Sequence, residues 1–262
     1  MATASAVSGR GKLWHVKGTW SARDDRTASA VWLGILWVGM ISGFGVDIPR
    51  YLHEKPSAPW IVHVHALVFS AWMLILTAQV LLVLGDRVSV HRKMGWVAAG
   101  WACLMAIFGP LAAFAWHAAN LGLPSGDPPF LSVQLLNMVG FLTLLTLGIA
   151  LRRNPATHRR MMILSTVALA DPGFSRFSGW LWPNPPQTLL GGFFWVFYGN
   201  VLLVVLMLGW DFWKKRLIRS FAIASISLLA LEWLETWLYF FPPWRQMATG
   251  WVQAWARWHI LG

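Results

Sequence analysis

The chain has 262 residues, of which 57% are hydrophobic and 12% are charged, and its formal net charge is +11. Ordinary soluble domains carry about 25% charged residues, so this composition argues against a water-soluble protein. The single cysteine, Cys103, lies in an apolar run, which excludes a disulfide framework, a Cys-x-x-Cys-His haem attachment and a cysteine-held iron–sulfur cluster.

Hydrophobic residues fall in runs of roughly 20, long enough to cross a hydrocarbon core of about 30 Å as α-helix. Backbone polar groups need internal partners in lipid, and the runs do not alternate as barrel strands do. We therefore predict an all-α polytopic membrane bundle with seven transmembrane helices. The expected spans are about 29–46, 60–85, 94–116, 130–151, 161–183, 188–211 and 217–241.

The predicted domains follow from these spans. Residues 1–28 form a basic cytoplasmic N-terminal segment, 29–241 the transmembrane domain, and 242–262 an extracytoplasmic segment. With the N-terminus inside, the inner segments hold 16 of the 21 Lys and Arg residues and the outer segments hold five. This bias predicts an N-in, C-out protein of a bacterial cytoplasmic (inner) membrane. It also explains the positive net charge without a nucleic-acid partner.

The C-terminal segment repeats tryptophan at helical spacing. Trp244, Trp251, Trp255 and Trp258 are separated by 7, 4 and 3 residues, which places them on one helical face. This pattern predicts an amphipathic helix in contact with membrane lipids at the outer interface. Contact with a partner membrane subunit is the alternative.

Residues 60–172 contain two similar helical hairpins. Their turns include His91-Arg92-Lys93-Met94 and His158-Arg159-Arg160-Met161, so equivalent positions are 67 residues apart. The spacing indicates a weak tandem repeat of one hairpin unit. The basic turns suit interfacial anchoring or the binding of phosphate headgroups.

Ionisable residues of the predicted spans concentrate toward the outer side. Asp171, Glu232 and Glu235 lie in the outer halves of their helices, as do His65 and His117. Such groups cost a few kcal/mol in lipid and normally face a cavity or a partner. We expect one outward-facing polar cavity, with separate pairings, such as Asp171 with Arg176, as the alternative.

The histidines suggest a redox function. His65 and His117, at similar predicted depth near the outer side, are candidate ligands of haem b or of a metal ion. His91 and His158 would form a second pair of haem ligands near the inner side. No single helix carries two well-buried histidines at the separation usual for such cytochromes.

Two other functions remain open. Asp171, Glu232 and Glu235 are the residue types for acid–base or metal-assisted catalysis on a lipid, prenyl or quinone-like substrate. The His-x-x-His-His set of membrane desaturases and the paired-histidine last helix of ceramidase-like hydrolases are missing. A non-catalytic accessory subunit of a larger membrane complex is the third possibility.

Two stretches resemble a large, mostly uncharacterised family of bacterial multi-span membrane proteins. Residues 63–96 hold a His-x-His pair and the helix start His91-Arg92-Lys93-Met94-Gly95. Residues 154–176 match the helix start Asn-Pro-x-x-His-Arg-Arg-Met-Met, followed by Asp171-Pro172 and Arg176. The resemblance covers under half of the chain and implies a multi-span fold without assigned chemistry. A looser similarity to b-type haem membrane cytochromes implies only the four candidate histidine ligands.

Overall fold

The computed structural model describes residues 22–258 except 124, 185 and 186, and this part of the chain is helical without a β-strand. Six helices are long and apolar enough to cross a membrane. The elements are α1 (Ala22–His53), α2 (Trp60–Leu84), α3 (Val88–Ala119), η1 (Pro128–Phe130), α4 (Leu131–Ala150), α5 (Pro155–Val167), α6 (Asp171–Leu181), α7 (Leu189–Trp213), α8 (Arg219–Phe240) and α9 (Pro242–Trp258).

The fifth predicted span, 161–183, is two short helices instead of one continuous helix. Helix α5 ends at Val167 and α6 begins at Asp171, with Pro172 in its first turn. Proline has no backbone N–H, and its ring clashes with the carbonyl four residues earlier, so a helix cannot continue through it undisturbed. We refer to residues 168–170 as the helix break.

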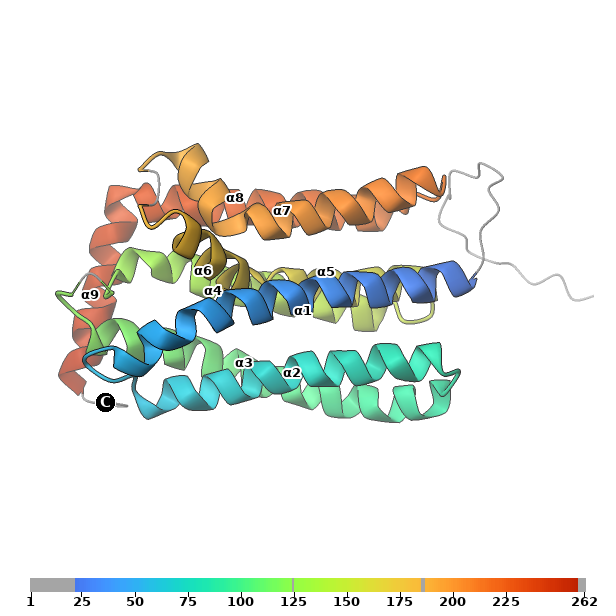
Figure 1. Cartoon of the computed structure of the whole chain (residues 1–262), viewed down its shortest axis with the longest axis horizontal. Helices are drawn as coiled ribbons and strands as arrows, with labels where there is room; N and C mark the ends of the chain where they lie inside the picture. The colour runs from blue at the N-terminus through green and yellow to red at the C-terminus, as the bar shows by residue number, and fades with distance from the viewer. Residues whose placement is uncertain (1–21, 124, 185–186, 259–262) are drawn as a thin grey trace, which may run out of the picture.

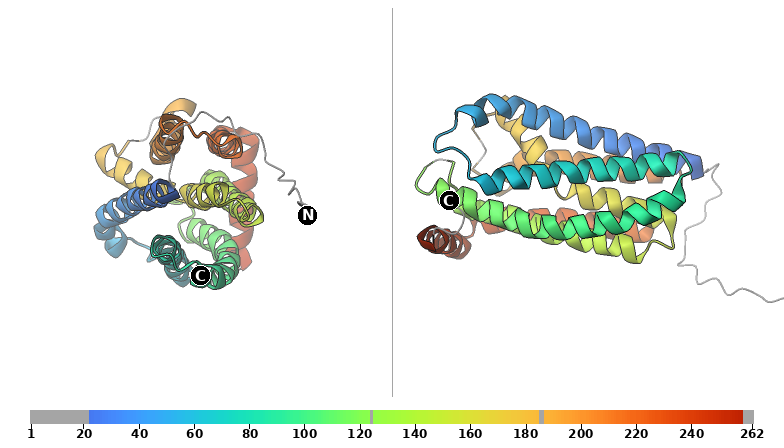
Figure 2. Two further views of the ribbon diagram at one scale, coloured as in Figure 1. Left: turned by 90° about the vertical axis from the view of Figure 1, so that its right-hand side faces the viewer. Right: turned by 90° about the horizontal axis from the view of Figure 1, so that it is seen from below.

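The helices are arranged in three layers (Figures 1 and 2). Helices α2 and α3 form one outer layer and α7 and α8 the other, with α1 and α5 between them. Helix α9 lies across one end of the bundle and packs on α3, η1 and α8 (Figure 1). We call this end the α9 end, and the opposite end, with the α2–α3 and α4–α5 turns, the hairpin end.

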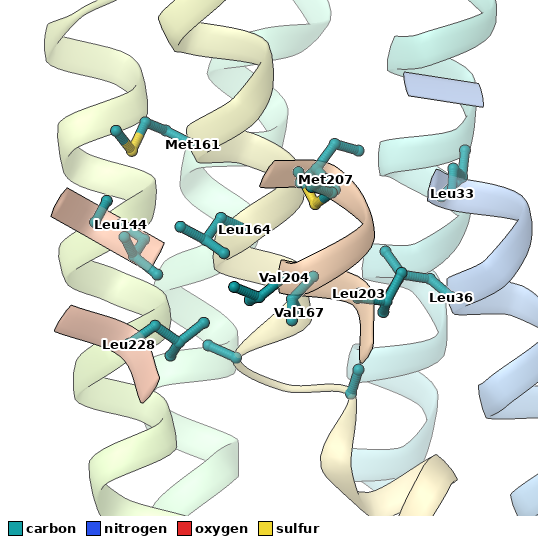
Figure 3. Close-up of a cluster of buried hydrophobic side chains, with 14 of the residues drawn as sticks. Leu33, Leu36, Leu144, Met161, Leu164, Val167, Leu203, Val204, Met207 and Leu228 are labelled. Carbon is teal, nitrogen blue, oxygen red and sulfur yellow. The ribbon is translucent and has the colours of Figure 1, made fainter. Parts of the chain in front are cut away.

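The main hydrophobic core surrounds α5 (Figure 3). Met161, Leu164 and Val167 recur every three residues on one side of this helix and are at most 1% exposed. Side chains of α1, α4, α7 and α8 pack around them, as Figure 3 shows for Leu36, Leu144, Leu203 and Leu228. A helix buried on so many sides needs little lipid contact, which explains how it can be short.

Glycines bring α1, α6 and α7 into close contact. A Cβ atom on Gly43 would overlap the carbonyl oxygen of Gly173, so the backbones of α1 and α6 touch at this point. The Phe174 ring occupies the space that a side chain would need at Gly39 of α1 and at Gly199 of α7. Small residues allow such close helix packing in membrane proteins.

Helix α1 begins at Ala22, within the expected 1–28 segment, so the helix starts before the predicted first span. The predicted domain boundaries stay predictions. Residues 1–21 lie outside the described part of the chain. At the other end, residues Pro242–Trp258 of the predicted C-terminal segment form α9. Its position at a membrane interface and the N-in orientation remain predictions.

Candidate functional site

The helix break places Asp171 inside the protein. It is the first residue of α6, and only 2% of its surface is exposed. The side-chain amide of Asn137, on α4, donates a hydrogen bond of 2.8 Å to its Oδ1 atom. The break therefore joins an intramembrane carboxyl group to an amide of a neighbouring helix.

Helix α8 supplies two more buried carboxyl groups. Glu232 and Glu235 are three residues apart, on one face of the helix, and both are 0% exposed. Asn200, on α7, donates from Nδ2 to Glu232 Oε1 over 2.8 Å. Ser132, on α4, donates a hydrogen bond to the backbone carbonyl of Glu235. The carboxyl group of Glu235 has no hydrogen-bond partner.

These side chains form what we call the carboxyl–amide cluster: Asn137, Asp171, Asn200, Glu232 and Glu235. Its three carboxyl groups are close enough to interact electrostatically. Among the described residues, none of the three has an Arg, Lys or His nitrogen within 4.0 Å. The predicted catalytic residues Asp171, Glu232 and Glu235 thus gather at one place, within the half of the bundle nearer the α9 end.

Hydrogen-bond donors are scarce in the cluster. Five buried oxygen atoms have no partner: Oδ1 of Asn137, Oδ1 of Asn200, Oε2 of Glu232 and both carboxyl oxygens of Glu235. Buried polar atoms in proteins are nearly always paired. Such a group of acceptors can be completed by protons, by a cation or by buried water.

Pairing of Asp171 with Arg176, the predicted alternative, is not observed. Arg176 donates from Nε to Asp47 on α1 over 2.9 Å and from Nη1 to the Pro172 carbonyl over 2.8 Å. Its guanidinium group lies over the Phe44 ring, 4.6 Å from the ring centroid. Asp171 bonds to Asn137 on α4 instead, and no described Arg, Lys or His nitrogen lies within ion-pair distance of its carboxyl group, although Arg176 still acts on it at longer range.

The structure does not bring the predicted outer metal ligands together. His65 packs against Phe69 and lies near the Phe108 carbonyl of α3. His117 is nine residues after Phe108 on α3, which corresponds to about 13 Å along the helix axis. His117 is paired with Gln134 instead, over 2.9 Å. The predicted third span ended at residue 116, whereas α3 continues to Ala119. The difference in depth between His65 and His117 therefore could not be predicted from the ends of the spans. Among the described residues, no group of three or more His, Cys, Asp and Glu could hold a metal ion.

The inner pair of histidines does meet. The His91 and His158 rings, one from each hairpin turn, have centroids 6.1 Å apart. His158 Nδ1 is 2.8 Å from the Gly148 carbonyl oxygen. The side-chain amide of Gln79 donates to His91 and accepts from the Gly95 N–H when its oxygen and nitrogen are assigned to satisfy both contacts. The two repeated turns therefore contact each other at the hairpin end through these histidines.

A second group of charged residues, not predicted from the sequence, lies at the hairpin end. Arg160 binds Asp211 through two bonds, of 2.7 and 2.5 Å, and also contacts Asp25. Asp25 accepts further bonds from Arg159 and Arg216, over 2.8 and 3.0 Å. We call these five residues the ionic cluster. The only indication of the ionic cluster in the sequence is that Asp25 and Asp211 are acidic residues close to basic residues at the ends of their helices.

Comparison with protein-family models, with curated proteins and with solved structures finds no match.

Proposed function

We propose that this is an ion-coupled membrane transport protein whose carboxyl–amide cluster binds protons or a small monovalent cation. The main support for this proposal is the set of five buried oxygen atoms that have no hydrogen-bond donor. They come from α4, α7 and α8, which together with α6 surround the cluster.

A bound proton changes the hydrogen bonding of the cluster. A protonated carboxyl group becomes a donor, and the unpaired Oδ1 atoms of Asn137 and Asn200 are acceptors for it. A hard cation such as Na⁺ also prefers carboxylate and amide oxygens, but it would require the helices to bring these groups closer, because no three of the described carboxyl groups are arranged as metal ligands. Ionisable residues buried in membrane helices commonly mark such ion pathways.

The helix break supports the same conclusion. Transporters use discontinuous helices to place ion sites near the middle of the membrane, where irregular backbone is tolerated only against protein or a cavity. Here the break lies directly before Asp171. Because the cluster side chains are at most 5% exposed, ions reach them only when the helices move.

Flux measurements test the proposal. In liposomes with a trapped pH dye, an imposed Na⁺ or K⁺ gradient is expected to change the internal pH when the protein is present. Asp171→Asn and Glu235→Gln should abolish the change. Arg245→Gln, on the exposed side of α9, is the matched control and should keep it. Absence of any proton or Na⁺ flux with the unaltered protein would refute the proposal.

A redox function is the second candidate, because His91 and His158 meet. These two imidazoles would hold a haem iron if one were bound here, since histidine nitrogen is a common axial ligand of haem. The bond from His158 Nδ1 to a carbonyl leaves its Nε2 available, as in many metal-ligating histidines. Haem b, if bound here, would supply one-electron chemistry. Reduced-minus-oxidised absorption spectra, with His158→Ala for comparison, test this prediction.

Acid–base catalysis would use the same three carboxyl groups. An apolar pocket beside the helix break favours a hydrophobic substrate such as a lipid, a prenyl compound or a quinone. Its enclosed space is only about 20 Å³, so such a substrate could enter only when the helices move apart; its lining includes Trp72, Met105 and Ala170, the residue before Asp171. The accessory-subunit function and the location in a bacterial inner membrane also remain proposals.

A further inference from the structure

We propose that protons reach the carboxyl–amide cluster from the α9 end, through a relay in which Asp127 and the hydroxyl group of Tyr239 precede Glu235. The relay rests on the proposed proton site, to which it adds two residues and a direction of entry. Asp127 lies directly before η1 and is partly exposed, whereas Glu235 is 0% exposed. Tyr239 lies one helical turn after Glu235 on α8, toward the α9 end.

The Tyr239 hydroxyl group connects α8 to the surface of this end. It donates a hydrogen bond of 2.7 Å to Oδ2 of Asp127. Phe130 and Phe240 pack around the tyrosine ring, with centroids 6.4 and 5.0 Å away. Arg245 lies over the ring and donates to the backbone carbonyl of Tyr239, so it leaves the hydroxyl group to Asp127. The ring is therefore surrounded by packing contacts, while its one polar atom meets an acidic residue that water reaches.

On the inner side, helix geometry brings Tyr239 next to Glu235. Residues four apart lie on the same face of an α-helix, with Cβ atoms about 5–6 Å apart. Long side chains lean toward the N-terminus of their helix, so we expect the Tyr239 ring to extend over the turn that carries Glu235. Ser132, five residues after Asp127, donates to the Glu235 backbone carbonyl over 2.9 Å and holds the start of α4 against this turn. Both carboxyl oxygens of Glu235 are buried without a partner and can therefore accept the proton.

The relay moves one proton and no electrons. A carboxylic acid can donate a hydrogen bond, and a hydroxyl group can donate and accept at the same time. When Asp127 carries a proton, its O–H donates to the Tyr239 oxygen. A new O–H bond forms there as the original tyrosine O–H bond breaks, and the released proton passes to Glu235 directly or across one water molecule. Tyr239 is then neutral as before, Asp127 is again a carboxylate, and Glu235 holds the proton.

His117 is a titratable neighbour of this relay. It lies in the last turn of α3 and interacts electrostatically with Asp127. Its Nε2 atom is 2.9 Å from Oε1 of Gln134, and its buried Nδ1 atom has no partner, so the ring is not hydrogen-bonded to Asp127. His117 therefore acts on the relay through its charge alone.

Exchange of the buried carboxyl proton for deuterium tests the relay without ion flux. In infrared spectra of the purified protein in detergent at mildly acidic pH, the C=O band of protonated Glu235 is the one that Glu235→Gln removes. On transfer to D₂O this band shifts at the rate at which the group exchanges its proton. Tyr239→Phe keeps the ring and removes the hydroxyl group, so the shift should be at least about tenfold slower. Asp127→Asn cannot carry a proton and should slow the shift as well, whereas Asp127→Glu should keep the original rate.

The direction of the change separates a relay from a structural role. A substitution that merely loosened the α9 end would let water in and speed the exchange, whereas loss of the relay slows it. Tyr51→Phe is the matched control, because the Tyr51 hydroxyl group also meets a titratable residue, His63, over 2.8 Å, but on α1 and α2. It should leave the rate unchanged. Equal rates in Tyr239→Phe and Tyr51→Phe, faster exchange in Tyr239→Phe, or no band that Glu235→Gln removes would overturn the proposal.

The relay and ion transport can fail separately. Proton flux into liposomes together with unchanged exchange in Tyr239→Phe would leave a transport protein that has no such relay. Slower exchange in Tyr239→Phe, with no flux through the unaltered protein, would support the relay and refute transport. The relay would then supply protons to a buried acid–base group.

Discussion

Buried carboxyl groups in this protein differ in whether they have hydrogen-bond partners. Glu235 is 0% exposed and neither of its oxygens has a hydrogen-bond partner, whereas Asp211 is 2% exposed and binds Arg160 through both oxygens. Removing the charge should therefore have different effects at the two positions. In Glu235→Gln the new amide can donate to a neighbouring oxygen, so we expect the midpoint of thermal unfolding to stay the same or rise. In Asp211→Asn, Arg160 loses a buried ionic partner, a change that costs about 3–5 kcal/mol, so the midpoint should fall. Thermal unfolding of the purified protein in detergent measures both. A lower midpoint for Glu235→Gln than for Asp211→Asn would mean that Glu235 has a structural role.

At the scale of single elements, glycines decide how closely α1 approaches α6. Gly43 meets the Gly173 backbone, whereas Gly34, on the same helix, has nothing within 4 Å of an added Cβ atom. Gly43→Ala should therefore displace α6 and lower the midpoint of thermal unfolding. Gly34→Ala is the matched control and should be neutral or slightly stabilising, since alanine favours a helix by about 1 kcal/mol over glycine. The movement of α6 should also reduce any ion flux, because Asp171 begins that helix. If both alanine variants behaved alike, the close contact of α1 and α6 would be refuted. Helix α9 supports a second prediction at this scale. It buries Ala248 and Val252, while Met247, Trp251 and Gln253 are exposed. At a membrane interface, a spin label at Met247→Cys in a Cys103→Ser background should be accessible to oxygen in lipid. A label at Gln253→Cys should be accessible to a water-soluble nickel complex. Equal exposure of both labels to water would place α9 away from the membrane.

For the whole molecule, the distribution of positive charge predicts its orientation in the membrane. Positive charge predicts that the hairpin end is cytoplasmic. Ser57, between α1 and α2, and Arg153, between α4 and α5, are exposed at opposite ends of the bundle. In the Cys103→Ser background, a membrane-impermeant thiol reagent added to spheroplasts should label Ser57→Cys. It should label Arg153→Cys only after lysis. The reverse pattern would invert the topology and place the ionic cluster on the outside.

The amino-acid sequence alone determined the class of the protein and its chemically unusual residues. Apolar runs of roughly 20 residues require membrane helices, because a chain in lipid must satisfy its own backbone. Asp171, Glu232 and Glu235 stood out because ionisable groups are rare inside such runs. The tertiary structure decided which groups meet. Asn137 and Asp171 are 34 residues apart in sequence, Asn200 and Glu232 are 32 apart, and Asp25 and Arg160 are 135 apart. Their contacts depend on which helices are neighbours and on how far each is shifted along its axis. Periodicity within one helix does not encode that shift, which is why His65 and His117 are separated while His91 and His158 touch.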